Sequence, residues 1–304
     1  MKYLDLQVNG AYGVDFNDDG LTAEGFQFAC GKLEASGVVG FLPTIITDSV
    51  DTMCSRIEKI VRIIDATPDL KKLVRGIHVE GPFLSGQSGF YGTHPLHHIR
   101  PAKERDAMRL LEAGNGFVRL VTLAPEQDPE FKVIRKLCDE GVLVFAGHTD
   151  AKFEVLTNAI DSGLIGFTHL GNGCIQQVDR HDNIVNRVLA LRDRLYITLI
   201  ADGIHLPGWL IKSWLGMIAI DRSIIISDSM SAAGMPPGEY KIGNQNILVE
   251  PTRRTRHRDH DYLAGSASTM QDMDRILSES LAICEADRNR CMLNNASSLL
   301  LRGT

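Results

Sequence analysis

The chain has 304 residues, of which 44% are hydrophobic, and a formal net charge of −6. This length and apolar content suffice to bury a large core in one α/β domain or two medium ones. With 32 basic against 38 acidic residues there is no basic excess, so we expect no nucleic-acid partner. No apolar run reaches the roughly 18 residues that span a bilayer, and the first residues lack the pattern of a secretion signal. We therefore expect a cytoplasmic protein with no membrane partner.

The cysteines are scattered and contain no CxxC pair. In a chain of this length, that pattern favours buried, reduced thiols over a disulfide framework. The six are Cys30, Cys54, Cys138, Cys174, Cys284 and Cys291.

Eight short runs, each continuously apolar and rich in β-branched residues, follow one another along the chain. Such runs are typical of strands that are buried on both faces of a parallel sheet. They cover residues 3–8, 38–42, 74–79, 118–123, 142–146, 164–168, 195–201 and 224–227.

Segments with helical periodicity separate these runs. Residues 50–66 and 151–162 each place apolar side chains on one helical face. Eight β–α alternations predict a single (β/α)8 TIM-type barrel over residues 1–304, with an open doubly wound sheet as the structural alternative. Several helices are predicted to stop at a glycine before the next strand, namely Gly37, Gly114, Gly141 and Gly163.

The segment 235–262 interrupts this alternation after the eighth strand. It contains Pro236-Pro237-Gly238, and its pattern favours a short hairpin over 240–249. The polar run 252–261, with His257 and His260, predicts a solvated, mobile loop. A second metal site or an anion-binding patch are the alternatives for this run.

Polar residues that could act in catalysis or metal binding follow most of the predicted strands. Because a barrel builds its active site from the carboxyl ends of its strands, we expect these side chains to meet at one mouth. They are Gln7 and Asn9 at the first strand, Glu80 at the third, His148 at the fifth, His169 at the sixth, Asp202 and His205 after the seventh, and Asp228 at the eighth.

One carboxylate and two imidazoles among them suit Zn²⁺ or a similar divalent ion such as Fe, Mn or Co. Three protein ligands leave a position for water, whose pKa the ion would lower to about 7. Asp228 suits the transfer of that water's proton to a leaving nitrogen. A single histidine at a strand end is more often structural, and Glu80 alone could be an ion-pair partner. The conjunction of these residues predicts a metal site, because unpartnered buried charges are too costly to collect in one place.

Ten motifs run in order along nearly the whole chain: DLQVNGAYGVDFND (5–18), FLPTIIT (41–47), GIHVEGPFL (76–84), GTH (92–94), TLAPE (122–126), AGHTDA (146–151), THLGNGC (168–174), IADGIHLP (200–207), ISDSMSAAG (226–234) and LAGSASTM (263–270). Together they resemble the N-acetylglucosamine-6-phosphate deacetylases of the amidohydrolase superfamily. The resemblance implies a metal-dependent hydrolase that removes the acetyl group from an N-acetylated amino sugar, with N-acetylglucosamine 6-phosphate as the expected substrate.

The resemblance also implies catalytic roles. Glu80, His148 and His169 would be the ligands of the metal. Asp228 would serve as the general base and then as the general acid. His94 would polarise the acetyl carbonyl together with the metal.

The resemblance further implies contacts to the sugar or its phosphate. Asn172, the Gly173 backbone and His205 would make them, with Arg180 as a phosphate-binding arginine from a neighbouring subunit. A homodimer is therefore expected.

At the first strand, Gln7 and Asn9 replace the His-x-His pair that gives many amidohydrolases a second metal. Amides are poor, neutral ligands, so one tightly held ion is expected.

The chain also departs from the family. The family's small β-domain is expected to be absent or reduced to the 235–262 segment. The run 179–183 predicts either a helix N-cap by Asp179 or Asp182, or an anion or sugar contact through Arg180 and His181. Two other functions stay open, namely hydrolysis of a different N-acyl compound or cyclic amide, and binding without catalysis on the same barrel.

Overall fold

The computed structural model describes residues 1–304 except 244, 258–262 and 303–304. Eight parallel strands form its main sheet and neighbour one another in chain order. All eight overlap the predicted strands, and the predicted (β/α)8 barrel is confirmed. The strands are β1 (Tyr3–Val8), β4 (Val38–Ile46), β5 (Ile77–Glu80), β6 (Val118–Leu123), β7 (Leu143–Ala146), β8 (Gly166–Phe167), β9 (Tyr196–Ile200) and β10 (Ser223–Ile226).

The sheet closes between its first and last strands. Val8 forms a parallel bridge with Ser229, just beyond β10, and the backbone N–H of Asn9 donates to the carbonyl of Ser229 at 2.8 Å. The carboxylate of Asp5 accepts the N–H of Ser227 at 3.1 Å. These contacts join β1 to the end of β10, and the open doubly wound alternative is therefore wrong.

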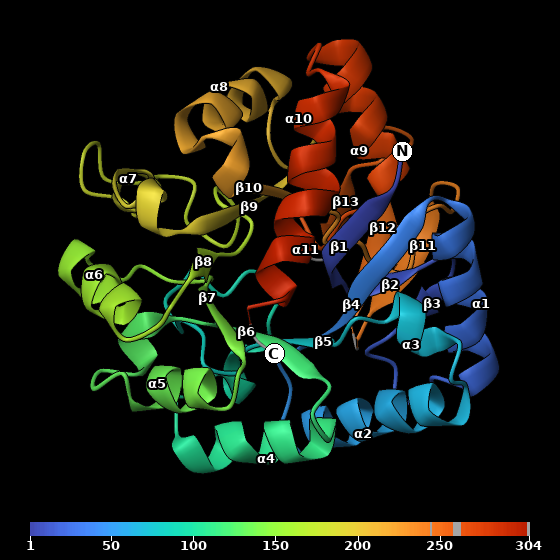
Figure 1. The fold of residues 1–304 in the computed structure, drawn as a ribbon, viewed down its shortest axis with the longest axis horizontal. Coiled ribbons are helices and arrows are strands. Elements are labelled where there is room, and N and C mark those ends of the chain that lie inside the picture. Colours follow the sequence, from blue (N-terminus) through green and yellow to red (C-terminus); the bar gives the residue numbers. More distant parts are fainter. Residues whose placement is uncertain (244, 258–262, 303–304) are drawn as a thin grey trace.

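Helices surround the strands in the view of Figure 1. Among the described residues, no helix combines the length and apolar character of a membrane span. The helices are α1 (Ala23–Ala35), α2 (Val50–Ala66), α3 (Leu70–Leu73), α4 (Glu104–Gly114), α5 (Lys132–Asp139), α6 (Phe153–Asp161), α7 (Ile184–Ala190), α8 (Gly208–Ile218), α9 (Met270–Arg275), α10 (Glu285–Asn289) and α11 (Asn295–Leu300).

The helix α4 stops at Gly114, as predicted, but the left-handed conformation that ends the helix is adopted by the next residue, Asn115 (φ 43°), because asparagine tolerates it. The predicted N-cap of α7 is wrong. Neither Asp179 nor Asp182 caps α7. That cap is Asn183, whose side chain accepts the backbone N–H of the residue three positions on at 3.0 Å.

Both aspartates of the 179–183 run are engaged nearby. Asp179 accepts the backbone N–H groups of His181 and Asp182, each at 2.9 Å. Asp182 pairs with Arg187 at 2.5 Å. These contacts close the turn before α7.

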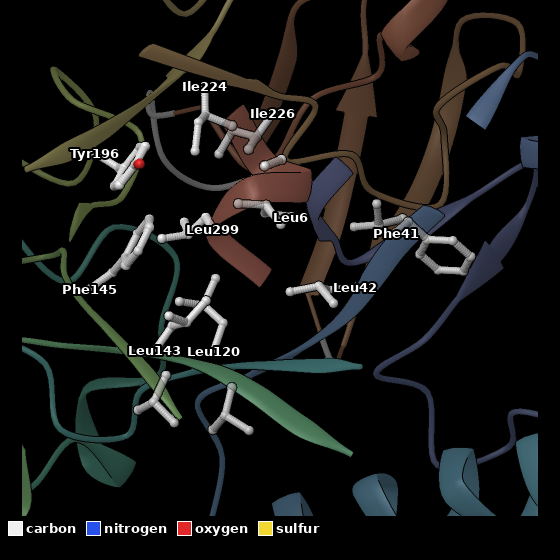
Figure 2. Packing of buried hydrophobic residues seen from close by; sticks show 14 of the residues in the cluster. Leu6, Phe41, Leu42, Leu120, Leu143, Phe145, Tyr196, Ile224, Ile226 and Leu299 are labelled. Carbon is white, nitrogen blue, oxygen red and sulfur yellow. The ribbon is translucent and has the colours of Figure 1, made fainter. Parts of the chain in front are cut away.

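The C-terminal helix α11 packs at the amino-terminal side of the barrel. Figure 2 shows Leu299 near the buried side chains of Leu143 and Phe145. The amide of Asn295 donates to the carbonyl of Ser223, the first residue of β10, at 2.7 Å. The opposite end of the barrel, where the strands have their carboxyl ends, is not covered by α11, and the polar residues that end the strands lie there.

Segment 235–262 contributes a three-stranded antiparallel sheet of β11 (Gly238–Ile242), β12 (Gln245–Val249) and β13 (Thr255–His257). A two-stranded hairpin, β2 (Gly10–Ala11) with β3 (Val14–Asp15), lies near the start of the chain. Ile242, Ile247 and Val249 of the three-stranded sheet pack with Ile46 of β4 and with Met230 in a small apolar cluster.

The predicted loop over 252–261 is wrong for residues 255–257. These residues pair with β12, and Thr255 is buried with its hydroxyl donating to the carbonyl of Gly265. Residues 258–261 of this run, including His260, lie outside the described residues.

All six cysteines are free, as the scattered pattern indicated. The expectation that they are buried is wrong for Cys284, which is exposed, and holds only in part for Cys138 and Cys174.

The packing between β7 and β8 leaves no room for a side chain at Gly166. A Cβ at Gly166 would lie 2.4 Å from two ring carbons of Phe145. Because a close-packed core resists added volume, Gly166→Ala should lower the free energy of unfolding by about 1–3 kcal/mol, measured by urea denaturation. The matched control is Gly31 in α1, which has open space around its Cβ position. Gly31→Ala should raise stability by up to about 1 kcal/mol, and similar losses in both variants would contradict this account.

Candidate metal centre and active site

Glu80, His148 and His169 converge at the carboxyl end of the barrel. Glu80 ends β5, and the two histidines lie two residues beyond β7 and β8. The Nε2 atom of His169 lies 3.0 Å from Oε1 of Glu80, and Nε2 of His148 lies 3.5 Å from the same oxygen. The three residues are buried, with ligand atoms within 4.8 Å of one another.

This spacing fits one divalent cation. Tetrahedral ligands held about 2.0–2.2 Å from an ion lie about 3.3–3.6 Å apart, close to the two observed separations. The Nδ1 atom of His148 lies 2.7 Å from the carbonyl oxygen of Phe90. Because a carbonyl oxygen accepts a hydrogen bond, the proton of the neutral ring lies on Nδ1, and the lone pair of Nε2 is left for a metal. The three residues can therefore hold an ion, although their role as ligands stays a prediction.

The backbone at the strand ends takes an uncommon form. His148 (φ 50°), His169 (φ 36°) and Asp228 (φ 46°) all lie in the left-handed region. Residues other than glycine adopt this region at a cost of about 1–3 kcal/mol, and such residues cluster at functional sites. Here all three line one pocket, so the strain coincides with the candidate site.

Two glycines make room for the ring of His148. A Cβ at Gly173 would lie 2.7 Å from its Nδ1 atom, and a Cβ at Gly92 would lie 3.1 Å from its Cε1 atom. Both glycines also have positive φ, at 61° and 55°. Any side chain at either position would therefore disturb the candidate ligand.

Asp228 is linked to this cluster through amides of the first strand. Its Oδ1 atom accepts hydrogen bonds from Asn9 Nδ2 at 2.8 Å and from Gln7 Nε2 at 3.0 Å. The same Gln7 nitrogen donates to Oε1 of Glu80 at 3.1 Å. The Gln7 amide thus bridges two carboxylates that would otherwise repel each other. In this arrangement both first-strand amides act as hydrogen-bond donors.

The two carboxylates differ in acidity. Burial alone would raise the pKa of Glu80, but the nearby imidazole groups of His148 and His169 outweigh burial and hold this pKa well below its usual value. Burial raises the pKa of Asp228, and the negative charge of Glu80 raises it further. Neighbouring carboxyl groups whose pKa values diverge are typical of active sites in which one group stays ionised and the other transfers a proton.

His94 lies against the same cluster. Its ring centroid is 4.5 Å from that of His148, and its Nε2 atom is 3.8 Å from Oε2 of Glu80. Burial, followed by the nearby charge of His148, lowers the pKa of His94 to about 3. The ring is therefore neutral and can donate one N–H. Its Nδ1 atom has no hydrogen-bond partner among the described residues.

His205 is held by a carboxylate. Its Nδ1 atom lies 2.7 Å from Oδ2 of Asp202, an oxygen that also accepts the hydroxyl of Ser266 at 2.8 Å. Burial would raise the pKa of Asp202, but the charge and hydrogen bonds of His205 lower it. Asp202 was predicted to lie at the end of its strand, but no role was predicted for it. The separation of three residues between Asp202 and His205 in the sequence was the signal that could have indicated their contact.

Three of the four predicted substrate contacts line the pocket, whose volume is about 270 Å³. Asn172, Gly173 and His205 belong to the lining, and the Nδ2 atom of Asn172 has no hydrogen-bond partner among the described residues. Arg180 is exposed between β8 and α7 and is not part of the lining. Its contact with a neighbouring subunit stays a prediction.

The pocket also contains residues that sequence reasoning did not place there. Arg254 comes from the polar run for which an anion-binding patch was one alternative. The sequence does not indicate which apolar residues line the pocket, because pockets and cores contain the same apolar residue types. Among the pocket residues that were not predicted are Ile46, Gln176, Ile242, Arg254 and Leu263.

No protein-family model matches the chain. An N-acetylglucosamine-6-phosphate deacetylase of Bacillus subtilis (strain 168) is 31% identical over 278 residues, which cover 91% of this chain and 68% of the relative. An N-acetylgalactosamine-6-phosphate deacetylase of Shewanella sp. (strain ANA-3) is 32% identical over 282 residues, which cover 92% of this chain and 68% of the relative. The chain thus spans about two thirds of the length of these curated relatives.

Solved structures agree with these relatives. An N-acetyl-D-glucosamine-6-phosphate deacetylase from Mycobacterium smegmatis, in complex with N-acetyl-D-glucosamine-6-phosphate, matches with a TM-score of 0.84 at 27% identity, covering 100% of this chain and 74% of that one. The corresponding enzyme from Thermotoga maritima matches with a TM-score of 0.85 at 25% identity, covering 98% of this chain and 77% of that one. With this fold, these identities and this coverage, the chain belongs to the N-acetylglucosamine-6-phosphate deacetylase family.

Proposed function

We propose that this protein hydrolyses the acetamide of N-acetylglucosamine 6-phosphate in a metal-dependent reaction. The observation that carries the proposal is the buried cluster of Glu80, His148 and His169, with Asp228 joined to it through Gln7. Membership of a family whose named relatives are amino-sugar-phosphate deacetylases supports the reaction class.

Zinc is the metal that we propose first, with Fe, Mn and Co as alternatives. Two imidazole nitrogens and one glutamate oxygen form a ligand set that zinc takes in hydrolytic sites, and they would be His148, His169 and Glu80. When bound there, the ion would polarise the acetyl carbonyl and lower the pKa of a water molecule.

Asp228 is the group that we propose to move the proton. Asn9 and Gln7 both donate to its Oδ1 atom, so Oδ2 is the oxygen left to exchange a proton. Its raised pKa brings the carboxyl group closer to the range in which a base and its conjugate acid both act. Asp228 would accept a proton from the attacking water and return it to the amide nitrogen as the C–N bond breaks. Acetate and the free amino sugar phosphate would result.

His94 is the proposed donor to the developing oxyanion. It is neutral and lines the pocket beside the three candidate ligands. A preorganised N–H in a buried site stabilises negative charge on the acetyl oxygen more in the transition state than in the substrate.

Recognition of the sugar falls to Asn172, the backbone at Gly173 and His205, which line the same pocket. We propose a homodimer in which Arg180 reaches the neighbouring subunit's phosphate site.

N-acetylgalactosamine 6-phosphate is the second candidate substrate, and the Shewanella sp. relative named for that sugar favours it.

Metal content tests the ligand assignment. The wild-type protein should hold roughly one ion per chain by elemental analysis, and a chelator should abolish acetate release until Zn²⁺ is restored. His169→Ala should lose nearly all of the bound ion, because two ligands without the third hold it weakly. The exposed His97 offers a matched control, and His97→Ala should keep the full content. Full occupancy in His169→Ala would contradict the assignment.

Asp228→Asn tests the proton-transfer role. The variant should keep its metal and fold, since asparagine also tolerates a positive φ. Its turnover of N-acetylglucosamine 6-phosphate, followed as acetate release, should fall by about 10²–10⁴-fold, because the side chain no longer accepts a proton. Turnover at the wild-type rate would reject the role.

A further inference from the structure

A buried arginine lies between two segments of the chain that lead away from the pocket. Arg187, on α7, is only 4% exposed. On one side it contacts residues 150–151, which follow the candidate metal ligand His148. On the other side it contacts Asp182, near the end of the segment 171–183 that connects β8 to α7. A single side chain therefore joins the two segments.

The guanidinium group of Arg187 uses all three of its nitrogens in these contacts. Nε donates to the carboxylate of Asp182 at 2.5 Å, and Nη2 donates to the backbone carbonyl of the same residue at 2.8 Å. Nη1 donates to the carboxylate of Asp150 at 2.8 Å and lies 3.2 Å from the carbonyl of Ala151. An arginine can hold both segments because its donors form a rigid planar fork, whereas a lysine has a single nitrogen.

A second side chain holds the segment that follows His148. Glu126, beyond β6, accepts the hydroxyl of Thr149 and the backbone N–H of Asp150, the latter at 3.1 Å. The backbone of His148 has a φ of 50°, and a residue keeps this conformation only where its surroundings fix it. Glu126 and Arg187 fix the residues that come directly after it.

The segment 171–183 lies against His148 as well. A Cβ at Gly173 would lie 2.7 Å from the Nδ1 atom of the His148 ring, so the backbone at this glycine packs on the ring. Asn172 and Gly173 are the proposed sugar contacts of this segment, and Arg180 is proposed to reach the neighbouring subunit. The position of the segment therefore affects the candidate metal ligand and the residues that we propose to bind substrate.

We infer that Arg187 is a positioning residue for both His148 and the segment 171–183. This inference rests on the proposed function for the roles of His148 and of the sugar contacts. Arg187 is not part of the pocket lining, so it acts through the residues that it holds. Its contact with Asp150 positions the metal ligand, and its contact with Asp182 positions the sugar contacts.

The test compares Arg187→Lys with two variants that each remove one side of the contact. Asp150→Ala should lower the affinity for Zn²⁺ by roughly tenfold, measured by competition with a chromophoric chelator, because the backbone after His148 is freed. Asp182→Ala should keep the Zn²⁺ affinity and raise KM for N-acetylglucosamine 6-phosphate by roughly threefold to tenfold with kcat unchanged, because the sugar contacts lose their alignment. Arg187→Lys should show both changes.

Arg194 offers a matched control, because it pairs with Asp161 at 2.5 Å on the surface. Arg194→Lys should match wild type in Zn²⁺ affinity and in KM. If Arg187→Lys lowers only the midpoint of thermal unfolding and keeps the wild-type Zn²⁺ affinity and KM, Arg187 stabilises the fold alone and the inference is overturned. Should Arg187→Lys fail to fold, wild-type Zn²⁺ affinity in Asp150→Ala together with wild-type KM in Asp182→Ala would overturn it.

Binding measurements separate this inference from the proposed function, because they require no turnover. If the wild-type protein binds Zn²⁺ but releases no acetate, the proposed reaction fails, and the Zn²⁺ affinity of Asp150→Ala still tests the contact with the metal ligand. Calorimetry with glucosamine 6-phosphate then replaces KM, and Asp182→Ala should bind this amine more weakly than wild type. Wild-type affinities in both variants would reject the inference, and a wild-type protein that binds no metal would reject both proposals.

Discussion

Burial of the Glu80 carboxylate between two imidazoles and an amide is the interaction on which the site depends. Leaving water disfavours the charge, and the contacts with His148, His169 and Gln7 compensate for that loss. The same close approach sets the spacing that suits a divalent cation. The left-handed backbone at both histidines is tolerated because the surrounding barrel holds these residues in place.

The first strand shows how the barrel manages two carboxylates in one buried space. Gln7 and Asn9 contribute neutral donors, and the Gln7 amide nitrogen donates to both Asp228 and Glu80. This leaves the two acids in different electrostatic surroundings, one ionised by its imidazole partners and one with a raised pKa. The proposed metal and the proposed proton carrier therefore have distinct places, as acid–base hydrolysis requires.

Much of the fold and the site could be predicted because the signals are local. Parallel strands buried on both faces read as apolar runs, and a polar residue that ends such a run, such as Glu80, has to lie at the barrel mouth. The errors arose where neighbouring structure outweighed local preference. Asn183 rather than Asp182 caps α7 because Asp182 pairs with Arg187. Residues 255–257 form a strand because they pair with β12, despite their polar composition.

Apolar runs along the chain were enough to predict eight strands, and the order of ten motifs was enough to show a resemblance to a family whose motifs carry the candidate ligands. The sequence predicted that the strand-end side chains would meet at one mouth, but it did not predict the hydrogen bonds between them. The Gln7 bridge to Asp228 joins residues that are 221 positions apart, and Arg254 reaches the pocket on a sheet that packs over Ile46. Such contacts depend on the packing of whole elements, and a local sequence pattern has no information about them until the chain has folded.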